Sequence, residues 1–198
     1  MLKKAVIDID NTLWNFCDAL YGRLKTLNPF VPSIDDWVHW DFWTNYCSED
    51  EFRAAINRIH LNQDDDAYMP YDEAGEFLET LKNHDFHIVV ASHRTAESYS
   101  QTKRWLRKHD LIFDELHCSP DKTLLFDECC RIVVDDSPFV LEKAVEKGVI
   151  AAGLMFPWNK NNGNNGYTLF NSLNEVLQHI LDTVKHSNLI QNTRLYPQ

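Results

Sequence analysis

The sequence predicts an α/β protein with a doubly wound, Rossmann-like parallel sheet and a helical cap inserted after the first strand. Three observations lead to this class. A short apolar strand opens the chain around residues 5–9. From residue 86 onward, apolar strand-like runs alternate with helical patterns, an order typical of a parallel sheet with helices on both faces. The stretch between them, residues 14–71, shows helical patterns alone, which indicates an insertion into the alternating core.

Length, composition and charge narrow the class further. The chain has 198 residues, of which 44% are hydrophobic, and this fits one folded domain with an insertion. No apolar run approaches the roughly 20 residues of a membrane span, and no signal-peptide core is visible. The five cysteines lack metal-type spacing, as expected of reduced thiols in the cytoplasm. The net charge of -11 disfavours nucleic acid and anionic membranes as partners.

The insertion at 14–71 carries three helical patterns. The first, 14–27, has apolar residues at helical spacing and ends at Asn28-Pro29. Ser33 is a candidate N-cap for a second helix. Ser48 and Glu51 have the spacing of a capping box, which predicts the start of a third helix. We therefore expect a small helical cap packed over an edge of the sheet.

The rest of the chain, residues 1–13 and 72–186, shows the alternating strand and helix patterns of the α/β core. A helix at 72–83 comes first. Strands are then expected at 86–91, 113–118, 131–134 and 149–154, and helices at 95–109, within 119–127, at 137–147 and at 172–185. Ser137 and Pro138 suit the N-cap and first turn of their helix, and Gly148 suits its end. Residues 187–198 show little periodicity, which is typical of a disordered tail.

Polar side chains follow several of the predicted strands at the point where each strand ends. They are Asp8 and Asp10, Ser92, Asp135 and Asp136, with Lys122 in the segment before the last pair. Because the carboxyl ends of parallel strands share one edge, where open α/β sheets bind ligands, these side chains are expected to meet.

This set of groups points to phosphoryl chemistry. Crowded carboxylates without a Cys/His cluster suit a hard cation such as Mg²⁺. A carboxylate beside the cation and a lysine can attack phosphorus and form an aspartyl-phosphate. A second carboxylate two residues further on can protonate the leaving oxygen and then activate water.

The same motifs resemble those of the haloacid dehalogenase-like superfamily of phosphohydrolases. They are Asp8-Ile9-Asp10-Asn11-Thr12, Ser92 after an apolar strand, Lys122, and Ile132-Val133-Val134-Asp135-Asp136. The resemblance implies that Asp8 is the nucleophile and a magnesium ligand, and that Asp10 is the general acid/base and offers its main-chain carbonyl to the metal. It further implies that Ser92 binds the phosphoryl group and that Lys122 holds Asp8. Asp135 and Asp136 would complete the metal site, with Asp136 favoured as the direct ligand.

Two families within the superfamily compete. The helical insertion, Asp121-Lys122-Thr123 and the segment 134–138 are similar to the deoxyribonucleotidases, although that family's first motif continues with Gly-Val where this chain has Asn11-Thr12. The segments 10–14 and 91–95 are similar to the magnesium-dependent phosphatases, whose insertion is much smaller.

Arg94 and three tryptophans are the candidate residues for the rest of the substrate. Arg94 either binds phosphate or a substrate carboxylate, or pairs with an acidic side chain at the surface. Most of the aromatic residues between positions 14 and 46 are expected to form the core of the cap. Trp14, together with Trp40 or Trp43, is a candidate for stacking on a nucleobase.

The sequence thus predicts a magnesium-dependent phosphomonoester hydrolase for a small phosphorylated metabolite, with a (deoxy)nucleoside 5'-monophosphate favoured. The alternatives are a phosphatase for a sugar phosphate or a phosphoprotein, a dehalogenase, and a non-enzymatic phosphate-binding protein. The pattern does not separate a monomer from a homodimer.

Overall fold

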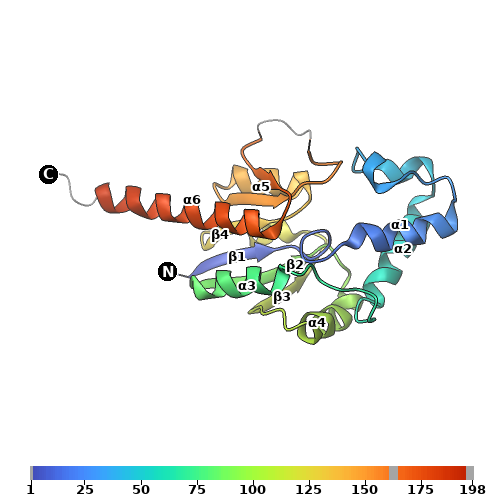
Figure 1. Ribbon diagram of the computed structural model, residues 1–198, viewed down its shortest axis with the longest axis horizontal. Coiled ribbons are helices and arrows are strands. Elements are labelled where there is room, and N and C mark those ends of the chain that lie inside the picture. The colour runs from blue at the N-terminus through green and yellow to red at the C-terminus, as the bar shows by residue number, and fades with distance from the viewer. Residues whose placement is uncertain (1, 161–164, 195–198) are drawn as a thin grey trace.

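A parallel β-sheet forms the centre of the computed structural model, which describes residues 2–160 and 165–194 (Figure 1). In this part of the chain the sheet has six strands in the order β3-β2-β1-β4-β5-β6, and neighbouring strands pair in parallel. The strands are β1 (Lys3–Ile7), β2 (Phe86–Ser92), β3 (Glu115–Cys118), β4 (Cys130–Val134), β5 (Ile150–Leu154) and β6 (Thr168–Phe170). The predicted doubly wound α/β class is confirmed.

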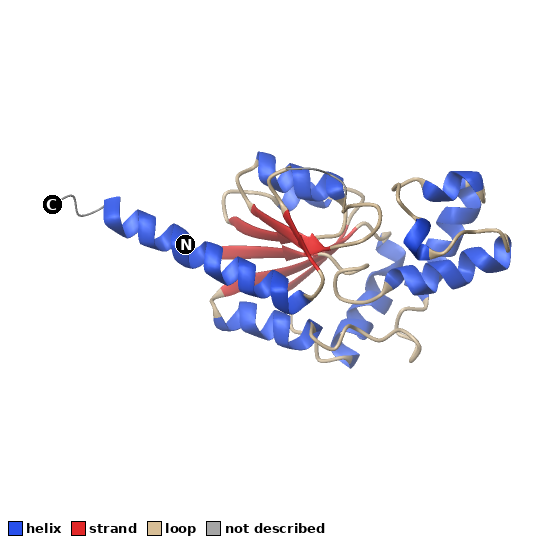
Figure 2. Cartoon of the chain, turned by 45° about the horizontal axis from the view of Figure 1, so that its top comes forward, coloured by secondary structure: helices blue, strands red, loops and turns tan. Residues whose placement is uncertain are grey.

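Helices cover both faces of the sheet (Figure 2). They are α3 (Ala74–Asn83), α4 (Tyr99–Lys108), α5 (Pro138–Glu146) and α6 (Leu173–Arg194). In the central strand β1, Ala5 and Ile7 belong to a core cluster with residues of α3, α4 and α6, whereas Val6 packs with residues of α5. This alternation buries both faces of the strand and explains why its sequence is a nearly continuous apolar run.

The insertion folds as the cap, built on α1 (Phe16–Leu27) and α2 (Glu49–Leu61). Figure 1 shows these helices at the end of the sheet toward which β1 points. The capping box of Ser48 and Glu51 forms at the start of α2 as predicted. The second helix expected after Ser33 is replaced by two short 3-10 turns, at Ile34–Asp36 and Phe42–Asn45. Between them the Trp37 and Phe42 rings stack with centroids 3.9 Å apart, which folds the segment back on itself.

Other elements differ from the expectation in extent. Strand β6 was not predicted, because three residues at a sheet edge leave little periodicity to recognise. The short helix within 119–127 is a 3-10 turn, η4 (Lys122–Leu125). Helix α6 continues past Lys185 to Arg194, so the expected tail is helical over its first part, and residues 195–198 lie outside the described residues. No helix in the described ranges combines the length and apolarity that a membrane crossing needs.

Gly153 lets β5 approach the end of β4 closely. A Cβ at this position would overlap the main-chain carbonyl oxygen of Asp135. We expect Gly153→Ala to lower the free energy of unfolding by about 2–3 kcal/mol, because backbone must shift to relieve the overlap. Urea denaturation measures this. Gly22→Ala is the control, since nothing lies within 4 Å of a Cβ in this α1 position, and it should stabilise the protein by about 0.5–1 kcal/mol. Equal effects of the two substitutions would contradict the close approach.

Candidate active site

The polar residues predicted at the strand ends surround one cavity at the carboxyl edge of the sheet. Asp8 follows β1, Ser92 ends β2, Asp135 and Asp136 follow β4, and Lys122 begins η4. All are buried, with at most 5% of their surface exposed. We call this the phosphoryl cavity. It is lined by Asp8, Asp10, Asn11, Phe16, Trp40, Ile56, His60, Ser92, His93, Lys122, Asp135, Asp136 and Ser137.

Lys122 joins two of the acids. Its Nζ lies 2.5 Å from Asp8 Oδ1 and 2.6 Å from Asp135 Oδ2. Burial alone would lower the pKa of Lys122, but the attraction of Asp135 and Asp8 outweighs it and raises that pKa above its ordinary value. Lys122 is therefore a fixed positive charge next to the predicted nucleophile.

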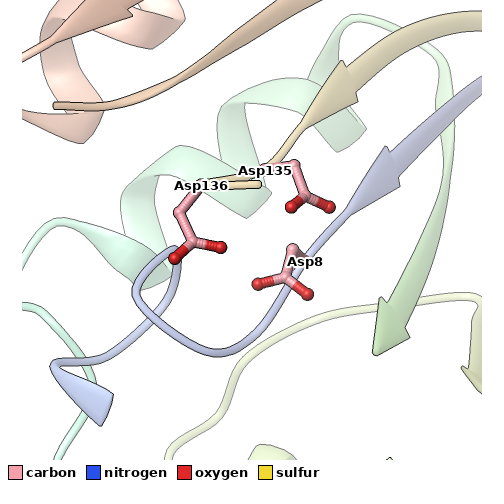
Figure 3. Close-up of side chains that lie close together, drawn as sticks. All are labelled: Asp8, Asp135 and Asp136. Carbon is pink, nitrogen blue, oxygen red and sulfur yellow. The ribbon is translucent and has the colours of Figure 1, made fainter. Parts of the chain in front are cut away.

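Three carboxylates converge beside this lysine. Figure 3 shows the side chains of Asp8, Asp135 and Asp136 directed toward a common space, and one ligand oxygen from each lies within 4.8 Å of the others. Burial raises the pKa of Asp8 from 3.8 to about 7, because attraction by Lys122 does not offset the loss of water and the repulsion from Asp135. Burial and the repulsion from Asp8 and Asp135 also raise the pKa of Asp136 well above its usual range.

The cluster has the donors and the charge that a hard cation requires. Its oxygen ligands and its uncompensated negative charge fit Mg²⁺. Both oxygens of Asp135 are engaged, Oδ1 with the Ser137 main-chain N–H and Oδ2 with Lys122. Asp136 accepts a hydrogen bond on Oδ2 from Asn11, and its role as the direct metal ligand stays a prediction.

Asn11 was not singled out from the sequence. It adopts a positive φ of 60°, which turns the chain sharply after β1. Its side chain donates to Asp136 and accepts a hydrogen bond from the main-chain N–H of Cys17 at the start of α1. Asn tolerates this left-handed conformation better than most residues. The Asn11 that departs from the deoxyribonucleotidase pattern thus links the nucleophile loop, the acidic cluster and the cap.

The carboxylate of Asp10 is held by donors from three parts of the chain. Trp14 Nε1 donates to Oδ1 at 2.8 Å, and His60 Nε2 lies 2.9 Å from Oδ2. Arg94 binds both oxygens, through Nη2 at 2.5 Å and Nε at 3.2 Å. Although burial acts in the opposite direction, Arg94 and then His60 hold the pKa of Asp10 well below its usual range. Asp10 is therefore a carboxylate here, the form that accepts a proton.

Two of the candidate substrate residues take other positions. Arg94 is 1% exposed and pairs with Asp10, so its partner is an acid of the site and not the surface acid that one alternative proposed. Trp14 is 2% exposed. It lines neither the phosphoryl cavity nor the neighbouring cavity described in the next paragraph. The expectation that Trp14 stacks on a base is wrong for this conformation, because its ring packs against Tyr68 and Trp105 while its N–H holds Asp10.

A second cavity, which we call the aromatic cavity, lies next to the first and shares part of its lining. It is lined by Asn11, Phe16, Cys17, Leu20, Trp37, His39, Trp40, Phe42, Trp43, Phe52, Ile56, Asp136 and Trp158. Trp40 and Ile56 line both cavities, whereas Trp43 lines the aromatic cavity and stacks on Phe52 at 4.5 Å. Trp40 and Trp43 thus both line the cavity next to the phosphoryl cavity, and stacking of either one on a nucleobase stays a prediction.

The sheet order, the cap inserted after β1 and the acidic cluster at the strand ends define a class of capped α/β proteins. No protein-family model and no curated protein matches the chain. Among solved structures, the chain is similar to a haloacid dehalogenase-like hydrolase from Streptococcus pneumoniae, with a TM-score of 0.63, 16% identity, and coverage of 90% of this chain and 98% of the other.

Two other solved structures show the same fold. A predicted phosphatase from Clostridium acetobutylicum has a TM-score of 0.61 and 20% identity over 92% of this chain and 100% of its own. CbbY from Rhodobacter sphaeroides, solved with phosphate, has a TM-score of 0.62 and 11% identity over 89% of this chain and 96% of its own. At these identities the likeness establishes the fold, and the chemistry rests on the site.

Proposed function

We propose that the protein is a magnesium-dependent phosphomonoester hydrolase that works through an aspartyl-phosphate on Asp8. The observation that carries this proposal is the buried contact of Lys122 with Asp8 inside the acidic cluster. A carboxylate held next to a fixed cation at a cavity wall is placed to attack phosphorus. The solved structures of similar fold include hydrolases and phosphatases, which agrees with this reaction class.

The residues divide the reaction into two steps. An oxygen of Asp8 attacks phosphorus and the ester P–O bond breaks, while Lys122 stabilises the charge on the transferring oxygens. Asp10 is ionised before the substrate binds, so it takes up the proton of the substrate's phosphate monoanion and passes it to the leaving oxygen. In the second step Asp10 accepts a proton from the water that hydrolyses the aspartyl-phosphate, and this proton leaves with the released phosphate. Asp8, Asp136 and the main-chain carbonyl of Asp10 would hold Mg²⁺, which supplies positive charge to the phosphoryl oxygens when bound.

The lining of the aromatic cavity favours a substrate whose leaving alcohol carries a planar ring. The described residues that line it include six tryptophan or phenylalanine side chains of the cap, and no lysine or arginine that would hold a second phosphate. Flat apolar walls bind rings by stacking and burial. We therefore favour a nucleoside 5'-monophosphate, deoxy or ribo, over a sugar phosphate or a phosphoprotein.

A substrate panel tests the proposal. Phosphate release is measured from nucleoside 5'-monophosphates, a sugar phosphate and a phosphopeptide, with Mg²⁺ and with a chelator. We expect nucleotides to react fastest and the chelator to abolish release. A sugar phosphate that reacts fastest would overturn the substrate class, and failure of the whole panel would favour a non-enzymatic phosphate-binding protein. Activity that persists in the chelator would overturn the metal requirement.

Metal and pH should act together on stability. Because the pKa of Asp8 is raised from 3.8 to about 7, the native state binds more protons than the unfolded state between these values. The stability of the metal-free protein is therefore expected to fall as pH rises through that range. Mg²⁺ should raise the melting temperature more at about pH 8 than at about pH 6, because protons compete for the ligands. Scanning calorimetry at both pH values checks this, and a larger shift at the lower pH would contradict it.

A further inference from the structure

The cap contacts Asp10 directly. His60, which is 5% exposed, lies in the last turn of α2, and its Nε2 reaches Asp10 Oδ2 at 2.9 Å. Because both oxygens of Asp10 accept hydrogen bonds from Arg94, the imidazole N–H donates to this carboxylate. Gln63, just beyond α2, accepts a hydrogen bond from Arg94 Nη1. His60 and Gln63, at the C-terminal end of α2, therefore contact both partners of the Asp10–Arg94 ion pair.

The other donors to Asp10 are held by contacts to α4 of the core. Arg94 follows β2, is 1% exposed and donates through Nη1 to Thr102 of α4 at 2.8 Å. Trp14 packs against Trp105 of α4, whose own N–H bonds to the Tyr68 carbonyl. Among these donors, His60 is the one that belongs to a cap helix. The distance and angle of its hydrogen bond to Asp10 therefore depend on the position of α2.

The same helix forms a wall of the aromatic cavity. Phe52, Ile56 and His60 are spaced by four residues, so they lie along one stripe of α2. Phe52 lines the aromatic cavity, Ile56 lines both cavities, and His60 lines the phosphoryl cavity. Phe16, which also lines both, packs its ring 5.4 Å from the His60 ring. A ring seated in the aromatic cavity would touch the helical face that ends on Asp10.

We propose that His60 is a positioning residue through which occupation of the aromatic cavity sets the orientation of the Asp10 carboxylate. The inference rests on the proposed function for its kinetic consequence, whereas the His60–Asp10 contact is testable without turnover. A ring in the aromatic cavity should then increase kcat as well as affinity. Orientation errors on the scale of an ångström can cost about 10²-fold in rate, which leaves room for a measurable effect.

Two esters with matched leaving groups isolate this effect. Benzyl phosphate and methyl phosphate both release a simple primary alcohol, but benzyl phosphate alone carries a ring for the aromatic cavity. In the wild type we expect kcat for benzyl phosphate to exceed that for methyl phosphate by about tenfold. In His60→Phe, which keeps a ring against Phe16 but removes the N–H, the two kcat values should converge while the ratio of their KM values is kept. Asn57→Ala, on the exposed face of α2, should keep both ratios.

The remaining outcomes are decisive. A wild-type kcat that is equal for the two esters, an unchanged kcat ratio in His60→Phe, or an equal fall in both kcat values would overturn the proposal. If the wild type hydrolyses neither these esters nor any other phosphate ester, the proposed function fails, and a double-mutant cycle in urea unfolding then tests the His60–Asp10 contact on which the inference depends. His60→Phe and Asp10→Asn should be non-additive there, and additive losses would overturn the contact.

Discussion

Asp8→Asn is expected to abolish phosphate release while raising the stability of the metal-free protein. An amide does not form the covalent intermediate, and loss of a nucleophile that acts with its partners as a unit costs about 10⁴-fold or more. The free energy of unfolding should rise at about pH 8 by roughly 1–2 kcal/mol. At that pH Asp8 is ionised, and its raised pKa means that the buried site disfavours the charged form, which the substitution removes. Phosphate release and urea unfolding on the same preparations check both effects.

Asp35→Asn is the matched control. Asp35 is an exposed acid of the cap, so its replacement should change neither activity nor stability appreciably. Hydrolysis by Asp8→Asn near the wild-type rate would contradict the assignment of Asp8 as the nucleophile. A stability loss at about pH 8 with activity also lost would instead indicate that Asp8 holds the fold, as an ordinary buried ion pair does.

Lys122→Met should be the most destabilising of the single substitutions considered. Methionine keeps an unbranched side chain of similar length but leaves Asp8 and Asp135 without their cation. Removing one partner from a buried ion pair costs about 3–5 kcal/mol. The loss is expected to be smaller at about pH 5 than at about pH 8, because Asp8, with a pKa of about 7, is neutral at the lower pH.

Urea unfolding at both pH values, without metal, measures this loss. Lys147→Met is the control, since Lys147 is exposed at the end of α5 and its replacement should stay within about 0.5 kcal/mol of the wild type. A loss for Lys122→Met that does not change between the two pH values would contradict the dependence on an ionised Asp8.

Some of this architecture could be predicted from the sequence because the relevant signals are local. Strand β1 is buried on both faces from residue 5 onward, so Ala5, Val6 and Ile7 form an apolar run up to Asp8. In β4, Ile132, Val133 and Val134 form the same kind of run up to Asp135. Because the strands are parallel, their ends meet, and residues separated by more than a hundred positions come together without any long-range signal in the sequence.

The environment of Asp10 could not be predicted in this way. His60 lies in an amphipathic helix pattern, where nothing distinguishes a buried histidine of the cap from one that reaches the core. The sequence also left open whether Arg94 pairs with an acid or binds a substrate, because it does not show that the end of β2 places Arg94 against Asp10. The spacing of Phe52, Ile56 and His60 was the available signal, but its meaning depends on which cavity that face of α2 meets.

The central claim is that Asp8 carries the phosphoryl group during turnover. The most direct measurement mixes the Asp10→Asn variant with Mg²⁺ and a nucleoside monophosphate, quenches in acid and locates the added phosphoryl group by peptide mass spectrometry. Asp10→Asn is used because loss of the proton acceptor should slow hydrolysis of the intermediate. We predict a phosphoryl group on the peptide that contains Asp8, and none in the Asp8→Asn, Asp10→Asn double variant. A phosphoryl group on another residue, or phosphate release by the wild type with no labelled intermediate in the variant, would contradict the claim.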